Sequence, residues 1–317
     1  MPALTYDDIT ATTIKHFRPA LVDNIFNDIP LFKRMRAQDA VSVRGGDSIM
    51  QSLLYATTTS GGSYSGYDVL LTTPNEQISA AEFSWKQYYV NITIDKLSVL
   101  KNSGPEQIFN LLQKRVQAAQ LTMADSLATD LFSDGTTNSS KCVTGLRAAV
   151  DDSTNIDTYG GILRSTYTWW KAIYKGNSGT DRALTIPIME DAYNDVEDGM
   201  DAPTCIVMGA DLYEKYWRLA EADKSLMNVM SGDMGLTTLS FNGVPIIKDR
   251  KCTAENIFML NEKYLELVIH SDEQFEVRPF QEPVDQNVAT SKVFVTLNLV
   301  SSNCRRQCRI VDLDYSL

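Results

Sequence analysis

Residues 105–131 read PEQIFNLLQKRVQAAQLTMADSLATDL, and this stretch decides the fold. Its apolar residues recur at steps of three or four, which places them on one face of an α-helix. That face carries Ile108, Leu112, Val116, Ala119, Met123, Leu127 and Leu131. Pro105 suits a first helical position, and Gly135 suits the region just past a helix end. The sequence predicts a helix of about 27 residues, roughly 40 Å long, on which other elements are built.

The segments before this helix predict strands. Within residues 76–95, apolar and polar positions alternate, so that Tyr88, Val90, Ile92 and Ile94 share one face of a half-buried strand. Residues 46–75 are rich in Ser, Thr, Gly and Tyr, with short apolar runs on either side of ATTTSGGSYSGY. This pattern predicts a long two-stranded loop with a flexible end, and loops of that length are uncommon unless they have a function.

The two ends of the chain differ from its middle. Residues 1–45 read as an arm, with one short helix around 19–28 that ends near Pro30. Residues 136–280 alternate between helical patterns, at 186–199 and 210–222, and short apolar strands, which predicts a compact α/β domain. Two strands, around 293–299 and 308–313, close the chain. The fold class predicted is α+β.

Composition excludes several classes of protein. The chain has 317 residues, 44% hydrophobic and 22% charged, which is ordinary globular usage and predicts about two domains. No apolar run approaches the roughly 18 residues of a membrane span, and the start is unlike a signal peptide. The net charge of −11 argues against sequence-independent binding of nucleic acid.

The sequence offers few residues for catalysis. Two histidines, His16 and His270, exclude clusters of histidine metal ligands, and five widely spaced cysteines read as reduced thiols. An acidic run at 190–201 is either a solvated helix face, with Asp191, Asp195 and Asp198 at helical spacing, or a divalent-ion site. No phosphate loop or nucleophile elbow is present. We therefore predict no catalytic residue, no cofactor-binding residue and no metal ligand.

Two further clusters have alternative interpretations. The basic group Arg305, Arg306 and Arg309 is either a contact for nucleic acid or a source of ion pairs with acidic residues of this chain or a neighbour. The aromatic group fits a stacking platform or, more simply, core or interface packing. Its members are Tyr167, Trp169, Trp170 and Tyr174.

Three local phrases add to this layout. EFSWK at 82–86 leads into the strand that ends the loop, TYGGILRS at 158–165 forms a glycine turn, and FNGVPII at 241–247 is followed by IFMLN. With these phrases, the order of arm, long loop, strand, long helix and α/β domain resembles the HK97-fold major capsid proteins of tailed bacteriophages. The resemblance covers the whole chain.

The resemblance implies a division of the chain. Residues 1–45 would be the N-terminal arm, 46–82 the E-loop, 83–140 the strand and spine helix of the P-domain, and 141–280 mainly the A-domain. Residues 281–317 would return to the P-domain as strands. The arm and the E-loop tip would contact neighbouring subunits. The contact residues expected there are Phe17, Phe26, Tyr55, Tyr64 and Tyr67.

The resemblance also implies a function. The chain would assemble as hexamers and pentamers into an icosahedral head that encloses double-stranded DNA without sequence-specific binding. It would be made in the host bacterial cytoplasm, reside in the virion, need no cofactor or membrane, and meet a portal and decoration proteins. Either a separate scaffolding protein exists or assembly needs none. Residues 45–85 contain no lysine, so we expect no covalent cross-link from the E-loop.

Three alternatives remain from the sequence. The first is an encapsulin shell, which has the same architecture. The second is another virion component, and the third is an enzyme that uses the acidic run with a divalent metal.

Overall fold

The structure is a computed structural model that describes residues 30–37, 42–43, 45–70, 72–97, 105–222, 230–231, 237–283 and 286–316. The helix expected around 19–28 lies outside these residues, as do Phe17 and Phe26. The first described element is α2 (Pro30–Ala37). Pro30 therefore begins a helix, where its missing N–H is harmless, although the sequence pattern had placed it near a helix end.

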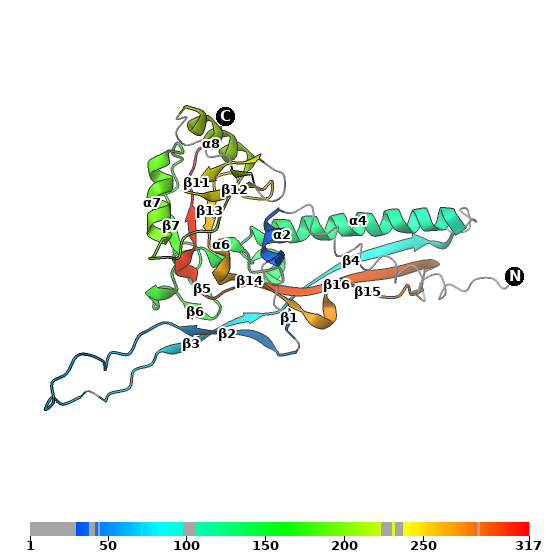
Figure 1. The fold of residues 1–317 in the computed structure, drawn as a ribbon. Coiled ribbons are helices and arrows are strands. Elements are labelled where there is room, and N and C mark those ends of the chain that lie inside the picture. Colours follow the sequence, from blue (N-terminus) through cyan, green and yellow to red (C-terminus); the bar gives the residue numbers. More distant parts are fainter. Residues whose placement is uncertain are drawn as a thin grey trace.

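One part of the molecule, here called the limb, is built on the long helix α4 (Pro105–Leu131). The 27 residues of α4 confirm the predicted length. Its described stripe residues are all buried, and they are Val116, Ala119, Met123, Leu127 and Leu131. In Figure 1, α4 runs beside a long pair of antiparallel strands.

Those strands belong to a five-stranded sheet. Its longest pairing joins β4 (Lys86–Asp95) to β16 (Val288–Ser301), and β4 buries Ile92 and Ile94 as the alternation predicted. The other strands of the sheet are β1 (Ser42–Val43), β14 (Leu265–His270) and β15 (Glu276–Val277).

A second part, here called the head, stands above one end of the limb (Figure 1). Its six-stranded sheet has the order β11-β12-β8-β13-β17-β7 and packs against α7 (Ile186–Val196) and α8 (Ala210–Ala222). The strands are β11 (Ser240–Phe241), β12 (Val244–Lys248), β8 (Cys205–Met208), β13 (Ile257–Leu260), β17 (Cys308–Ile310) and β7 (Ile173–Lys175).

Sheet pairing crosses the boundary expected at residue 280 in both directions. Strand β14, which precedes the boundary, pairs with β16 of the limb, whereas β17, which follows it, pairs with β13 and β7 of the head. The helix predicted to reach residue 199 ends at Val196, because Glu197 adopts an extended conformation; Gly199, with a positive φ of 66°, lies in the turn that follows.

The third part is a hairpin of β2 (Ser48–Leu54) and β3 (Ile78–Ser84) that projects away from both head and limb (Figure 1). Short elements join the parts. They are α5 (Thr137–Ser140), α6 (Leu146–Ala149), β5 (Thr158–Tyr159), β6 (Ile162–Leu163), η1 (Thr168–Trp170), β9 (Met230–Ser231), β10 (Thr237–Thr238), η2 (Glu262–Tyr264), η3 (Ser271–Glu273) and η4 (Cys304–Arg306). No helix of the described residues is long and apolar enough to cross a bilayer.

Candidate functional site

The base of the β2–β3 hairpin is packed against the rest of the chain. Its inner face buries Ile49, Leu53, Ala81 and Phe83. The ring of Phe83 meets the edge of Tyr159, with 5.1 Å between ring centroids. Apolar packing at its base thus fixes where the hairpin leaves the rest of the molecule.

Just beyond this base, Tyr55 stacks on Trp169 with ring centroids 4.9 Å apart and planes 13° apart. The sequence had placed Tyr55 among contacts between subunits. In the described chain it is half-buried against its own Trp169, and its exposed remainder faces the same groove as Arg305.

The turn between β5 and β6 holds the hairpin. Gly160 and Gly161 have φ of 58° and 74°, the conformation of a two-residue hairpin turn. The carbonyl of Gly160 accepts a hydrogen bond from the Glu82 N–H at 2.9 Å. A Cβ on Gly160 would lie 2.8 Å from Cζ of Phe83, whereas one on Gly161 would meet nothing within 4 Å. Glycine is therefore required at position 160 for two reasons, the positive φ of the backbone and the lack of space beside the Phe83 ring.

Arg164, which follows this turn, is fully buried and acts as a hub. Its guanidinium donates to the carbonyls of Ala148 and Ala149 at 2.8 Å each and to that of Ile156 at 3.1 Å. It also lies 5.1 Å from the ring centre of Tyr159. These carbonyls include the end of α6, where a cation is favoured. Arg164 lies in the GGILR phrase, but no pattern in the sequence predicted its role.

Trp170 decides between the two interpretations of the aromatic cluster. It is 1% exposed, and its Nε1 donates to the carbonyl of Tyr159 at 2.9 Å. Because a buried indole with a satisfied N–H is a core residue, Trp170 does not form a stacking platform. Trp169 remains half-buried under Tyr55.

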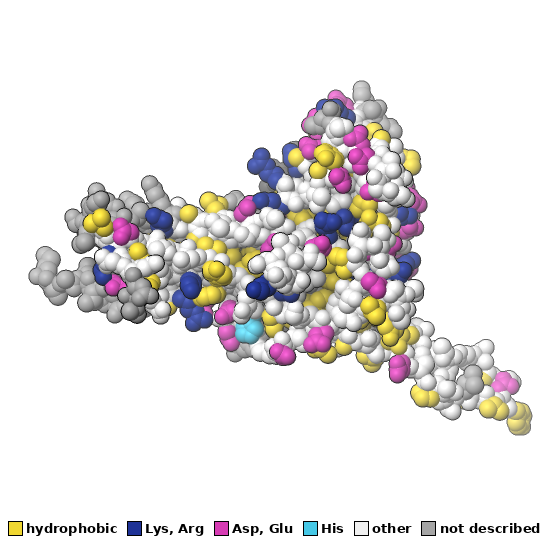
Figure 2. Space-filling model, turned by 180° about the vertical axis from the view of Figure 1, so that it is seen from behind, with side chains coloured by type: hydrophobic (Ala, Val, Ile, Leu, Met, Phe, Trp, Pro, Cys, Tyr) yellow, Lys and Arg dark blue, Asp and Glu magenta, His cyan; other side chains and the backbone are white. Residues whose placement is uncertain are grey.

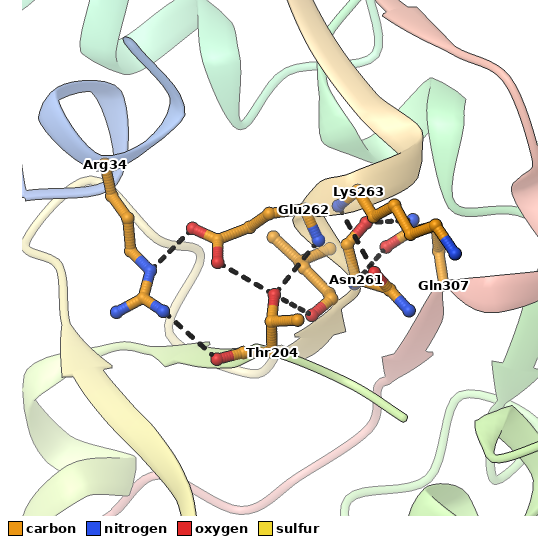
Figure 3. Close-up of polar contacts among 7 residues, drawn as sticks. Arg34, Thr204, Asn261, Glu262, Lys263 and Gln307 are labelled. Carbon is orange, nitrogen blue, oxygen red and sulfur yellow. Dashed lines mark hydrogen bonds and ion pairs between the residues drawn. The ribbon is translucent and has the colours of Figure 1, made fainter. Parts of the chain in front are cut away.

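A second anchor joins α2 to the head (Figure 3). Nε of Arg34 lies 2.6 Å from Oε1 of Glu262, whose side chain is only 1% exposed. Thr204 completes the site, since its hydroxyl donates to Oε2 of Glu262 at 2.8 Å and its carbonyl accepts from Arg34 at 3.2 Å. Burial alone would lower the pKa of Arg34, but the bond and charge of Glu262 raise it overall. The buried carboxylate is thus fully paired.

Next to it, two side-chain amides pair with backbone groups. Gln307 accepts from the Asn261 N–H and donates to the Asn261 carbonyl, both at 2.9 Å. Figure 3 shows this pair beside Glu262. Since β17 begins one residue after Gln307, the pair joins the start of β17 to the turn after β13 that leads into Glu262.

The remaining part of the hairpin contrasts with these anchors. Seven of the fifteen exposed large apolar side chains among the described residues belong to it. They are Met50, Leu54, Tyr64, Tyr67, Val69, Leu70 and Ile78. At the end of the hairpin, Asp68 accepts from the Ser65 N–H at 2.7 Å and its own N–H returns a bond to the Ser65 carbonyl. Residues 64–70, here called the tip, thus hold a defined turn whose apolar side chains face solvent.

The acidic run pairs with basic side chains. Lys175 lies 2.7 Å from Asp191 and 2.5 Å from Asp195, and Arg306 pairs with Asp198. Asp198 lies beyond the end of α7, so its predicted place on the helix face was wrong. In the described parts of the chain, no three His, Cys, Asp or Glu side chains are arranged to hold a metal ion.

The other candidate residues are structural neighbours of these elements. Arg309 lies over the rings of Tyr174 and Phe258, and His270 accepts from the Gly45 N–H at 3.3 Å. All five cysteines are buried and unpaired. Burial raises the pKa of thiols such as Cys205, so they are poor nucleophiles.

Comparison with known proteins gives a likeness in structure without one in sequence. No family model and no curated protein matches the chain. Among solved structures, it is similar to the capsid asymmetric unit of cyanophage A-1(L), with a TM-score of 0.63 and 16% identity over 86% of this chain and 90% of that one.

Two other shells are similar over comparable lengths. For the SrpI encapsulin of Synechococcus elongatus, the TM-score is 0.58 at 12% identity over 90% of this chain and 89% of that one. For a virus-like particle from Pyrococcus furiosus, it is 0.53 at 11% identity over 94% and 98%. The chain thus has the HK97-type fold that its sequence resemblance implied.

Proposed function

We propose that this chain is the subunit of a closed protein shell, and specifically the major capsid protein that forms hexamers and pentamers in the icosahedral head of a tailed phage. The observation that carries the proposal is the fold, because the likeness to the cyanophage capsid unit extends over nine-tenths of that chain. The role is structural and has no catalytic step.

The extended hairpin supports this proposal independently. A solvent-facing apolar patch on a projecting hairpin is unfavourable for a free protein and typical of a contact with another molecule. A surface that meets a different surface of the next copy makes a heterologous contact, and such contacts form rings where the rotation between copies closes. Tyr64 and Tyr67 lie on such a surface, and the arm residues Phe17 and Phe26 remain proposed contacts with the same purpose.

The proposal includes the wider setting of the shell. The division into arm, E-loop, P-domain and A-domain follows the family, with the β2–β3 hairpin as E-loop and α4 as spine. The net charge of −11 suits a wall that encloses double-stranded DNA without gripping it. Assembly in the bacterial cytoplasm, a portal, decoration proteins and a separate scaffolding protein belong to the same proposal.

Electron microscopy of the protein expressed alone tests the shell. We expect closed particles hundreds of ångströms across, eluting in the void volume of a size-exclusion column. If particles are absent, co-expression with the scaffolding protein from the same genome is the second arm. Small monodisperse species in both arms would contradict the shell.

An encapsulin is the second candidate, favoured by the likeness to the SrpI shell. The two functions differ in contents. Particles recovered from the natural source would hold nuclease-protected double-stranded DNA if the chain is a phage capsid, and a co-purifying protein if it is an encapsulin.

A further inference from the structure

Arg309 is a buried cation on the face of the head sheet that is turned away from α7 and α8. Its neighbours in β17, Cys308 and Ile310, pack under those helices, so Arg309 points to the opposite face. The side chain is 5% exposed. Its guanidinium lies 5.7 Å from the ring centre of Tyr174 and 5.9 Å from that of Phe258. Aromatic groups thus surround a charge that water no longer reaches.

The guanidinium of Arg309 has few polar partners. Among the described residues, its one hydrogen bond joins Nη2 to Oδ1 of Asn256 at 3.5 Å, which is long for such a contact. Its Nε is buried and has no partner among these residues. Burial therefore lowers the pKa of Arg309. A buried charge normally has a partner of opposite charge, and this one lacks it.

Arg147 of α6 brings a second cation to the same place. The Ala172 N–H donates to the Asp151 carbonyl at 3.1 Å, which ties the segment after α6 to the start of β7, the neighbour of β17. The guanidinium of Arg147 forms no hydrogen bond or ion pair with another described residue, and its Nε is buried. Its charge lowers the pKa of Arg309 further. The two cations are therefore close together, and both lack a counter-ion.

Two carboxylates of this region have other partners. Oδ1 of Asp151 accepts from three backbone N–H groups of the loop that follows, and its Oδ2 accepts from the Asn155 amide at 2.9 Å. Oδ1 of Asp134 accepts two hydrogen bonds from Thr136, at 2.7 and 3.0 Å. These two bonds lower the pKa of Asp134, and the charge of the α6 arginine contributes less. Neither carboxylate forms an ion pair with the two arginines in the described chain.

This pair of cations is unfavourable without an anion, because each has lost water and the like charges repel each other. Acidic side chains are not scarce in the molecule. The chain has 40 acidic and 29 basic residues, and Figure 2 shows acidic side chains on the surfaces of head and limb. None of those in the described parts pairs with Arg147 or Arg309. The missing anion therefore comes from solution.

We propose that Arg147 and Arg309 form a binding site for a small tetrahedral oxyanion of the class of inorganic phosphate. Guanidinium groups present N–H donors in a fixed fork that matches such an ion. Arg147 is half-buried, so the ion would enter from its side. Arg309 is too deeply buried for the backbone of a nucleic acid to reach it. The bound ion would join α6 to the head sheet, whether or not the chain forms a shell.

Thermal unfolding of the full chain, in phosphate and in chloride buffers of equal ionic strength, tests the site. We expect about 10 mM phosphate to raise the unfolding midpoint by about 2–4 °C over chloride. Phosphate also stabilises proteins in general, because it is excluded from their surfaces. The decisive quantity is therefore the difference between the natural chain and variants that lack one arginine.

Each arginine of the site has a variant of similar length. Arg309→Met removes the buried charge, and in chloride it should unfold at the same or a higher temperature, because an unpaired buried cation adds no stability. Arg147→Met changes a half-buried residue and keeps the test valid if Arg309→Met does not fold. Each variant should lose the rise caused by phosphate. The matched control Arg305→Met changes an exposed arginine and should keep it.

Phosphorus NMR measures the binding directly. The natural chain and Arg305→Met should broaden the signal of inorganic phosphate, and the two site variants should not. Equal broadening and an equal rise in all four chains would mean an adventitious ion only, and no rise in the natural chain would also overturn the site. Short duplex DNA should give no rise. A rise with DNA that both site variants lose would overturn the assignment to a free ion. None of these results depends on shell assembly, so they leave the proposed function to its own test.

Discussion

The two ends of the β2–β3 hairpin use the same residue types for opposite purposes. At its base, aromatic and charged groups find partners within the chain, as Arg164 does with four carbonyls and Tyr55 with Trp169. At its tip, Tyr67 and Val69 have no such cover. The comparison teaches that contacts within the chain fix the direction of the hairpin, while the apolar side chains of its tip stay exposed.

The largest expected effect is at the hub. Arg164→Met keeps the length of the side chain but leaves buried carbonyls without donors, which should lower the free energy of unfolding by about 3–5 kcal/mol. Urea unfolding of unassembled subunits measures this. Arg305→Met changes an exposed arginine that lines the groove beside Tyr55. It is the control and should change the free energy of unfolding by less than about 0.5 kcal/mol. Equal effects would mean that the base is not anchored through Arg164.

The second-largest effect is expected at the ion pair between Arg34 and Glu262. Arg34→Met leaves the buried Glu262 carboxylate unpaired and should cost about 2–4 kcal/mol, less than the hub because Arg34 is itself 31% exposed. Lys263→Met breaks the solvent-exposed pair with Asp201 and should change the free energy of unfolding far less than Arg34→Met. The added change Glu262→Gln should recover part of the first loss. No recovery would show that the charge is not the cause.

The glycine turn gives a sharper internal comparison. Gly160→Ala should cost about 2–3 kcal/mol, because a positive φ is combined with a Cβ 2.8 Å from Phe83 and 3.0 Å from Ala81. Gly161→Ala has a similar φ and open space, so it should cost only about 1 kcal/mol. Thermal unfolding of both variants checks the difference. Equal midpoints would mean that Phe83 moves freely and the hairpin seat is loose.

At the tip, stability and assembly should separate. Tyr67→Ser with Val69→Ser should change the free energy of unfolding by less than about 0.5 kcal/mol, since neither side chain is covered in the chain. The yield of shells should fall at least tenfold, measured by sedimentation. Met200→Ser, equally exposed but outside the hairpin, should leave that yield unchanged. A normal yield from the tip variant would remove the tip from the contact.

The sequence predicted elements with a local signal and missed partnerships without one. The bounds of α4 followed from one stripe and two terminal residues, and the alternation predicted the buried face of β4. The bond between Arg34 and Glu262 joins residues 228 positions apart, which no local pattern encodes. The place of β17 in the head sheet was missed for the same reason, because its partners β13 and β7 are distant along the chain.

A groove between α4 and the turn at 248–251 was also missed, since it appears only when that turn is folded against α4. Within the glycine phrase, the pair Gly160–Gly161 did carry a readable signal for a tight hairpin turn. The contact of this turn with the ring of Phe83 could not be predicted, because the two are far apart in the sequence.

The smallest effect is a dependence on pH at Asp249. Burial raises the pKa of this carboxyl above its usual range, so the folded subunit holds the proton more tightly than the unfolded chain. Its contribution to stability is therefore present below the unfolded pKa of about 3.9 and is lost as pH rises through the folded pKa. Asp249→Asn cannot ionise, so its subunits should be at least as stable as the natural chain at neutral pH.

Thermal unfolding of unassembled subunits from pH 4 to pH 8 measures this dependence. Because burial raises the pKa of Asp249, the natural chain should lose stability as pH rises through that pKa, whereas Asp249→Asn should lose less over the same range. Identical pH profiles for the natural chain and the variant would show that this buried carboxyl does not cause the dependence.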